Sequence, residues 1–263
     1  DLSISGYSEF QLQYVDEDIA DRGDDGPREW FTRQDHEIVF RATGVGDATG
    51  ISYGVNLELE AASGDGAEGV NAEWDEAWIF VSGNWGEVRL GDEDAVTDNL
   101  KVTANFVEAG TGGLDGDGKA SARDTRQVDG GEASKFIYYT PQIAGFQAGI
   151  SYAINGADRG SFIGSNQGTL DNLETEDEDE TDLATKDHID VGANYLGSFG
   201  GVDVGVYGGL SYFGIADAPG FDDESALGWQ IGGLVGFAGF QLAGSYWDND
   251  DDLAGTGITA MDD

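Results

Sequence analysis

The segment GNWGEVRLGDEDAVTDNLKVTANFVEAGTGGLDGDGKASARDTRQVDGGE, residues 83–132, decides how the rest of the chain is interpreted. It opens with a tight turn at 83–85 and a short strand-like run at 87–90. Residues 92–132 then show no strand periodicity and are rich in Gly and Asp, before alternation resumes at Ser134. Segments this long without regular structure are uncommon in compact domains unless they have a function. We therefore predict that residues 92–132 form one functional loop in an otherwise regular β-structure.

The composition is strongly acidic and rich in glycine. The 263 residues include 52 Asp and Glu against 12 Lys and Arg, a formal charge of −40, with no Cys. This charge excludes nucleic-acid binding through phosphate contacts, which needs a basic surface, and the lack of Cys removes thiolate metal sites. The chain has 43 Gly but 3 Pro, together with many aromatic residues, a combination typical of curved sheets.

Period-two alternation of apolar residues predicts eleven strands. In the first, Leu2, Ile4 and Phe10 share one face and polar residues share the other. The fourth is apolar on both faces: we assign Trp74, Trp78 and Phe80 to one face, which indicates packing against a neighbouring subunit or an inserted loop. The predicted strands cover residues 1–15, 32–43, 51–60, 72–82, 87–90, 134–140, 146–155, 188–196, 202–214, 226–237 and 240–247.

The connections between these strands alternate in length. Long acidic connections follow the odd-numbered strands and tight turns follow the even-numbered ones. This asymmetry predicts an all-β fold, a transmembrane antiparallel up-and-down β-barrel with an apolar outer face and a polar lumen. A soluble, halophilic β-sandwich is the alternative, although it would be expected to mix loop lengths. Closed barrels use even strand numbers, so we expect residues 1–263 to be a single barrel domain that lacks its C-terminal strands.

Three segments resemble the general-diffusion porins of Gram-negative bacteria, in particular those of alphaproteobacteria. They are LSISGY at residues 2–7, GNWGEVRLGDED at 83–94 and FIYYTPQIAGFQAGISY at 136–152. The resemblance implies a homotrimer of sixteen-stranded barrels in the outer membrane, in contact with lipid and lipopolysaccharide. It also implies that the third long loop, here residues 92–132, folds inward as a constriction loop.

In such a porin, basic side chains of the barrel wall face acidic side chains of the constriction loop. By strand parity we expect the basic wall to be formed by Arg33, Arg41, Arg89 and Lys135. The facing acids are expected to be Asp98, Glu108, Asp115, Asp117 and Asp124. The alternatives are structural ion pairs of the arginines with Asp35 or Glu37, and loop acids that are only solvated.

No cofactor is required, although acidic clusters offer candidate calcium ligands. One candidate site is Asp115 and Asp117, and the other is formed by Glu174, Asp177 and Asp179. Diffuse binding of counter-ions is the favoured alternative. The two histidines are isolated in sequence, and no catalytic spacing is present, so we expect the protein not to be an enzyme.

These observations predict an outer-membrane porin, a passive diffusion channel for ions and small hydrophilic solutes that prefers cations. A substrate-specific porin and a surface-binding or adhesion barrel are alternatives within the same fold. The expected partners are copies of the chain, lipid and lipopolysaccharide, and small solutes and cations, but not nucleic acid.

Overall fold

The computed structural model describes residues 1–14, 30–61, 72–103, 130–156, 185–215 and 225–249. Within them the chain forms eleven β-strands and one short helix. The elements are β1 Leu2–Tyr14, β2 Trp30–Val45, β3 Ser52–Ala61, β4 Ala72–Gly83, β5 Gly86–Glu93, α1 Val96–Asn99, β6 Ala133–Tyr139, β7 Phe146–Asn155, β8 Thr185–Phe199, β9 Val202–Ile215, β10 Ser225–Phe237 and β11 Phe240–Asn249. None of the described helical structure is long and apolar enough to span a membrane.

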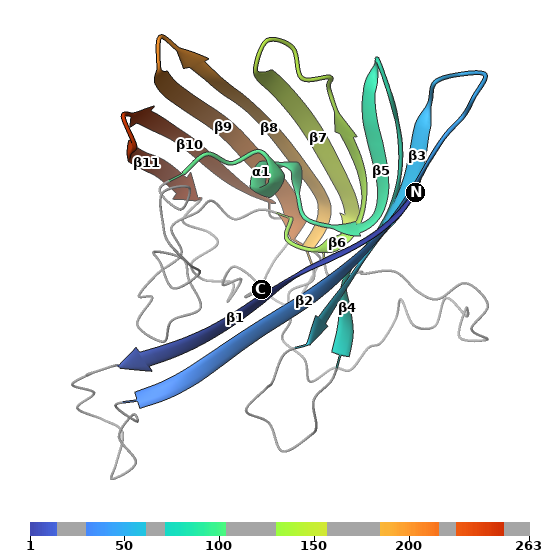
Figure 1. The fold of residues 1–263 in the computed structure, drawn as a ribbon, viewed down its shortest axis with the longest axis horizontal. Coiled ribbons are helices and arrows are strands. Elements are labelled where there is room, and N and C mark those ends of the chain that lie inside the picture. The colour runs from blue at the N-terminus through green and yellow to red at the C-terminus, as the bar shows by residue number, and fades with distance from the viewer. Residues whose placement is uncertain (15–29, 62–71, 104–129, 157–184, 216–224, 250–263) are drawn as a thin grey trace.

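The strands form one antiparallel sheet in which each strand pairs with its neighbours in the sequence, from β1 to β11. This order confirms the predicted up-and-down topology. The sheet curves strongly, and the tight turns lie together along one end (Figure 1). β1 and β11 are its two edges, so the described strands form an open part of a barrel and not a closed one.

The two faces of the sheet have opposite chemistry. Large apolar side chains on the convex face are exposed, such as Ile4 at 65%, Ile79 at 52% and Phe136 at 59%. Polar side chains on the concave face are buried, including Ser151 and Ser211. A water-soluble sheet would bury the apolar face, whereas a transmembrane barrel presents it to lipid. The exposed apolar residues of the convex face therefore confirm the membrane-barrel pattern that the sequence alternation predicted.

A β-bulge corrects the predicted faces of β4. Leu57 pairs with Ala77, but Leu59 pairs with Trp74, so β4 contains one extra residue at this point. Because an extra residue reverses the alternation beyond it, Trp74 lies on the convex face and is 52% exposed. The prediction that Trp74 shares a face with Trp78 is therefore wrong.

The residues that follow β5 pack on the concave side of the sheet. The chain turns inward after Glu93, forms α1, and places that helix inside the curve of the sheet (Figure 1). Val96, Leu100 and Val102 form a buried cluster with Ile137, Tyr139 and Tyr207 of the wall. The core of the described structure therefore lies between the sheet and the start of segment 92–132.

Candidate functional site

Two arginines stack on aromatic side chains of the concave face. The guanidinium carbon of Arg41 lies 4.8 Å from the ring centre of Phe80 and 5.5 Å from that of Trp78. Arg89 lies 4.4 Å from the ring centre of Trp78 and 4.8 Å from that of Tyr139. Such cation–π contacts hold each guanidinium group against the aromatic side chains of the wall. They also explain why β4 is apolar on both faces, since its inward aromatics support the arginines.

The two arginines differ in their charged partners. Arg89 forms ion pairs with Glu87, at 2.7 Å, and with Glu93, which is buried. Arg41 has no ion pair among the described side chains. Among the described side chains, Glu37 forms no ion pair with Arg41 or Arg89, and the side chain of Asp35 lies outside those described. Among the described residues, Arg89 is therefore largely neutralised by carboxylates, whereas Arg41 is held by aromatic rings.

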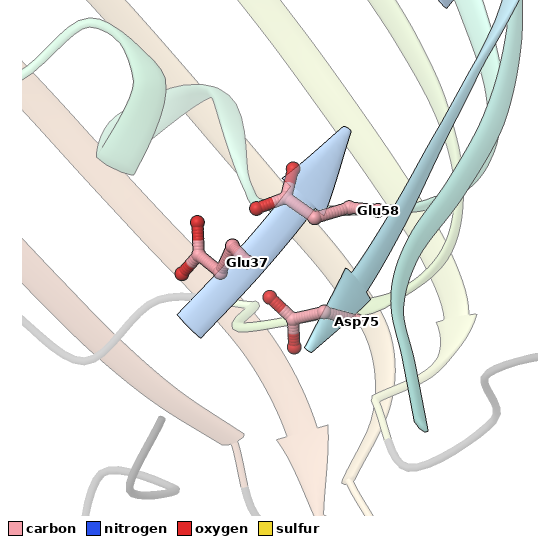
Figure 2. Close-up of side chains that lie close together, drawn as sticks. All are labelled: Glu37, Glu58 and Asp75. Atoms are coloured by element: carbon pink, nitrogen blue, oxygen red, sulfur yellow. The ribbon is translucent and has the colours of Figure 1, made fainter. Parts of the chain in front are cut away.

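A group of acidic side chains lies on the same wall, and the sequence analysis missed it. Figure 2 shows the carboxylates of Glu37, Glu58 and Asp75 turned toward one another. One carboxylate oxygen of each residue lies within 4.8 Å of one from each of the other two. Parity alone places Glu37 and Glu58 inward, but Asp75 joins them only because of the bulge in β4. We call Glu37, Glu58 and Asp75 the carboxylate group. It offers the hard oxygen atoms that cations such as Ca²⁺ prefer.

Beside the carboxylate group, Glu76 is held by two donors. Its Oε2 accepts a hydrogen bond of 2.9 Å from Trp78 Nε1 and one of 3.4 Å from Asn56 Nδ2. These bonds link the acidic part of the wall to the tryptophan that lies beneath both arginines. Negative and positive groups are therefore fixed side by side on β2–β5.

The wall formed by β7–β9 is instead covered by the start of segment 92–132. Ser151 Oγ accepts a hydrogen bond of 3.2 Å from the backbone N–H of Val96. Asn194 Nδ2 donates to the carbonyl of Leu100 at 3.0 Å, and Tyr207 Oη donates to the carbonyl of Thr97 at 2.9 Å. Wall side chains thus satisfy backbone groups that the four-residue helix leaves unpaired.

Glycines on β8–β10 allow this close approach. A Cβ atom on Gly232 would overlap the carbonyl of Val102, and one on Gly205 would lie 2.9 Å from Val102 Cγ1. A Cβ on Gly209 would lie 3.1 Å from Thr97 Cγ2, and one on Gly192 would lie 3.2 Å from Val96 O. Glycine in a strand often marks the place where another backbone comes close. We call Gly192, Gly205, Gly209 and Gly232 the glycine bed.

The structure brings together some of the residues predicted for the constriction. Arg41 and Arg89 share Trp78 on the wall. Lys135 lies on the concave face but is 2% exposed, and its ammonium donates to backbone carbonyls. Asp98 belongs to α1 and pairs with Lys101, a residue that the sequence analysis did not single out.

The other predicted site residues cannot be placed. Arg33 belongs to β2, but its side chain is not among those described. The acids Glu108, Asp115, Asp117 and Asp124 lie outside the described residues, as do the candidate calcium ligands Glu174, Asp177 and Asp179.

The fold and its faces define a class of protein. A curved antiparallel meander, apolar outside and polar inside, with a segment packed against its inner wall, is the architecture of an outer-membrane β-barrel. Residues 1–262 match the profile of the Gram-negative porin family, and the chain belongs to that family. This confirms the resemblance noted from the sequence, places the protein in the outer membrane, and agrees with the expectation that it is not an enzyme.

Individual relatives support this assignment. Outer membrane porin protein 32 of Delftia acidovorans is 30% identical over 215 residues, covering 74% of this chain and 56% of the relative. An uncharacterized protein of Rickettsia typhi is 26% identical over 200 residues, covering 64% of this chain and 44% of the relative. The chain thus spans about half the length of these curated relatives.

The fold is also similar to that of a solved porin. A mutant porin of Rhodopseudomonas blastica superposes with a TM-score of 0.51 at 18% identity, over 95% of this chain and 85% of that one. At this identity the likeness concerns the fold alone.

Proposed function

We propose that the protein is a passive diffusion channel for ions and small hydrophilic solutes, with a preference for cations. The observation that carries this proposal is the polar wall of β2–β5. The carboxylate group and Glu76 bring four acids to this wall, against Arg41 and an Arg89 that is already paired with two other carboxylates. A lumen with an excess of fixed negative charge attracts cations and repels anions.

Transport through such a channel involves no chemical step. Solutes cross in water along the polar concave face, while the apolar convex face contacts lipid. Segment 92–132 narrows the passage, and Arg41 and Arg89 face its acids, so a transverse field orients water and dipolar solutes. Buried α1 supports this role, because the described start of the segment lies on the inner side of the sheet.

The assembly and its ions follow from the same proposal. We infer a homotrimer, with lipid and lipopolysaccharide around its apolar surface. Calcium binding at Asp115 and Asp117, or at Glu174, Asp177 and Asp179, stays a prediction, to be tested by calcium titration of the purified protein.

The function is tested by electrical recording from the full-length protein in planar lipid bilayers. We expect stable ohmic conductance, and a reversal potential across a KCl gradient that indicates a permeability ratio in favour of K⁺. Absence of conductance would contradict the channel function. A reversal potential of the opposite sign would contradict the cation preference alone.

A further inference from the structure

One row of residues crosses the wall of β2–β5 and has Trp78 near its middle. The pairing register places side by side, across the four strands, Arg41, Asn56, Trp78 and Gly91. Residues paired in this way project from the same face of the sheet. A Cβ atom on Gly91 would lie 2.7 Å from Trp78 Cα and 3.0 Å from Trp78 Cβ, so glycine lets β5 lie this close to the tryptophan. Trp78 itself is 4% exposed.

Trp78 contacts groups of opposite charge through different parts of its indole ring. The N–H at the edge of the ring, Nε1, donates the 2.9 Å hydrogen bond to Oε2 of Glu76. The guanidinium carbon of Arg89 lies over the ring, 4.4 Å from its centre, and that of Arg41 lies 5.5 Å from it. An indole N–H only donates, so it suits an acid, whereas the π-system attracts cations. A single uncharged side chain therefore holds one carboxylate and two guanidinium groups.

These contacts keep Glu76 apart from the arginines. Among the described side chains, Glu76 forms no ion pair with Arg41 or Arg89, although all three groups contact the same ring. Asn56 Nδ2 is a second donor to Oε2, at 3.4 Å, and none of the described donors binds Oε1. The charge of Glu76 is therefore available to solutes in the lumen and is not cancelled by Arg41.

We propose that Trp78 is a positioning residue on which the cation preference depends, because its indole N–H holds Glu76 away from Arg41. The inference rests on the proposed channel function and names a residue that sets its selectivity. Without this N–H, the carboxylate of Glu76 rotates toward Arg41, which lies against the same ring and has no ion pair among the described side chains. That ion pair removes one negative charge from the lumen, so the attraction for cations falls.

The first test removes the indole N–H and keeps an aromatic ring. In Trp78→Phe, we expect the reversal potential across a KCl gradient to shift toward zero by as much as in Glu76→Gln. The two changes combined should give no further shift, because both act through one carboxylate. Trp85→Phe is the matched control, since Trp85 is 40% exposed in the turn after β4 and should leave the reversal potential unchanged. A wild-type reversal potential in Trp78→Phe, or shifts that add in the double variant, would overturn the proposal.

The second test observes the hydrogen bond without a current. Indole N–H signals of the six tryptophans are recorded by NMR from the full chain, labelled with ¹⁵N-tryptophan, in detergent micelles. A bond to a carboxylate is stronger than one to an amide, so we expect one signal to move upfield in Glu76→Gln and to be absent in Trp78→Phe. Asp203→Asn, at an exposed site on β9, should move none. Six unmoved signals in Glu76→Gln would overturn the proposal. A wild-type channel that prefers anions would instead contradict the proposed cation preference, whereas the moved signal would still show that Trp78 positions Glu76.

Discussion

The concave face of the sheet has two halves that differ in what lies against them: glycines on β8–β10 leave room for the start of segment 92–132, whereas β2–β5 carries stacked arginines and aromatics. On β2–β5 it carries long charged and aromatic residues, among them Arg41, Trp78 and Arg89. On β8–β10 it carries the glycine bed, and across β7–β9 the short hydroxyl groups of Ser151 and Ser211. The convex face shows no such division, since exposed apolar residues continue from β1 to β11.

This difference shows how one strand pattern can build two surfaces. The convex face is uniform because contact with lipid favours apolar side chains all around the barrel. The concave face can differ from strand to strand. Glycines leave room for the backbone of segment 92–132, and large side chains occupy the wall where the described part of that segment does not pack. We call β2–β5 the open half and β7–β10 the covered half. The start of segment 92–132 packs on the covered half, where glycines leave space for its backbone.

The largest expected effect is in the open half, at Arg89. Arg89→Ala leaves Glu93 buried without its cation, and breaking a buried ion pair in this way costs about 3–5 kcal/mol of folding free energy. Arg41→Ala removes a group that stacks on aromatic rings and has no ion pair among the described residues, so it should cost about 0.5–2 kcal/mol. Thermal unfolding in detergent measures both. Similar losses would show that the two arginines do not have the different roles assigned to them.

The next effect is in the covered half, at Gly232. Gly232→Val forces a side chain into the carbonyl of Val102, and overpacking of this kind costs about 1–3 kcal/mol and displaces the segment. Gly208→Val is the matched control, because a Cβ at Gly208 meets no atom within 4 Å. Single-channel conductance should change in the first variant and not in the second. Unchanged conductance in both would mean that the glycine bed does not position the segment.

A smaller effect is expected at Tyr207. Tyr207→Phe removes the hydroxyl that donates to the carbonyl of Thr97 and leaves a buried acceptor unpaired, at a cost of about 1–2 kcal/mol. Tyr212→Phe, on the same strand but exposed, should have no measurable effect on unfolding. A destabilisation of equal size in both variants would show that the loss of stability comes from a change in β9 and not from the missing hydrogen bond to Thr97.

The smallest effect concerns the carboxylate group. Glu58→Gln replaces one of three crowded carboxyl groups by a neutral amide, so we expect stability to rise by about 0.2–1 kcal/mol while the preference for K⁺ falls. Glu58→Asp keeps the charge and serves as the control for selectivity in the KCl gradient. An unchanged reversal potential in Glu58→Gln would mean that this group does not contribute to the cation preference.

Sequence alternation was sufficient to predict the fold. Each of the eleven strands occurs where period-two patterning placed it, with ends that extend further, as in β2 and β8. Alternation depends on the two environments of the sheet, lipid and lumen, and is therefore visible in the sequence. The bulge that moves Trp74 outward and Asp75 into the carboxylate group depends on pairing between strands, so local pattern could not reveal it.

The site was harder to predict, for a related reason. Parity placed Arg41, Arg89 and Lys135 on the concave face, but it could not show that Lys135 is buried beneath the segment. α1 was not predicted either, because four residues are too few for a helical period to be detected. The sequence shows many glycines, but it does not show which of them pack against residues 96–102, because that segment is distant from β8–β10 in the sequence.

The most direct test of the division into an open and a covered half is the accessibility of introduced cysteines in a chain that has none. Arg41→Cys and Ser211→Cys place thiols on the open and covered halves, and a small cationic thiosulfonate reagent is applied while the current is recorded. The account predicts rapid modification and a lower current in Arg41→Cys, with protection in Ser211→Cys, whose parent residue is 1% exposed. Equal rates of modification in the two variants would contradict it.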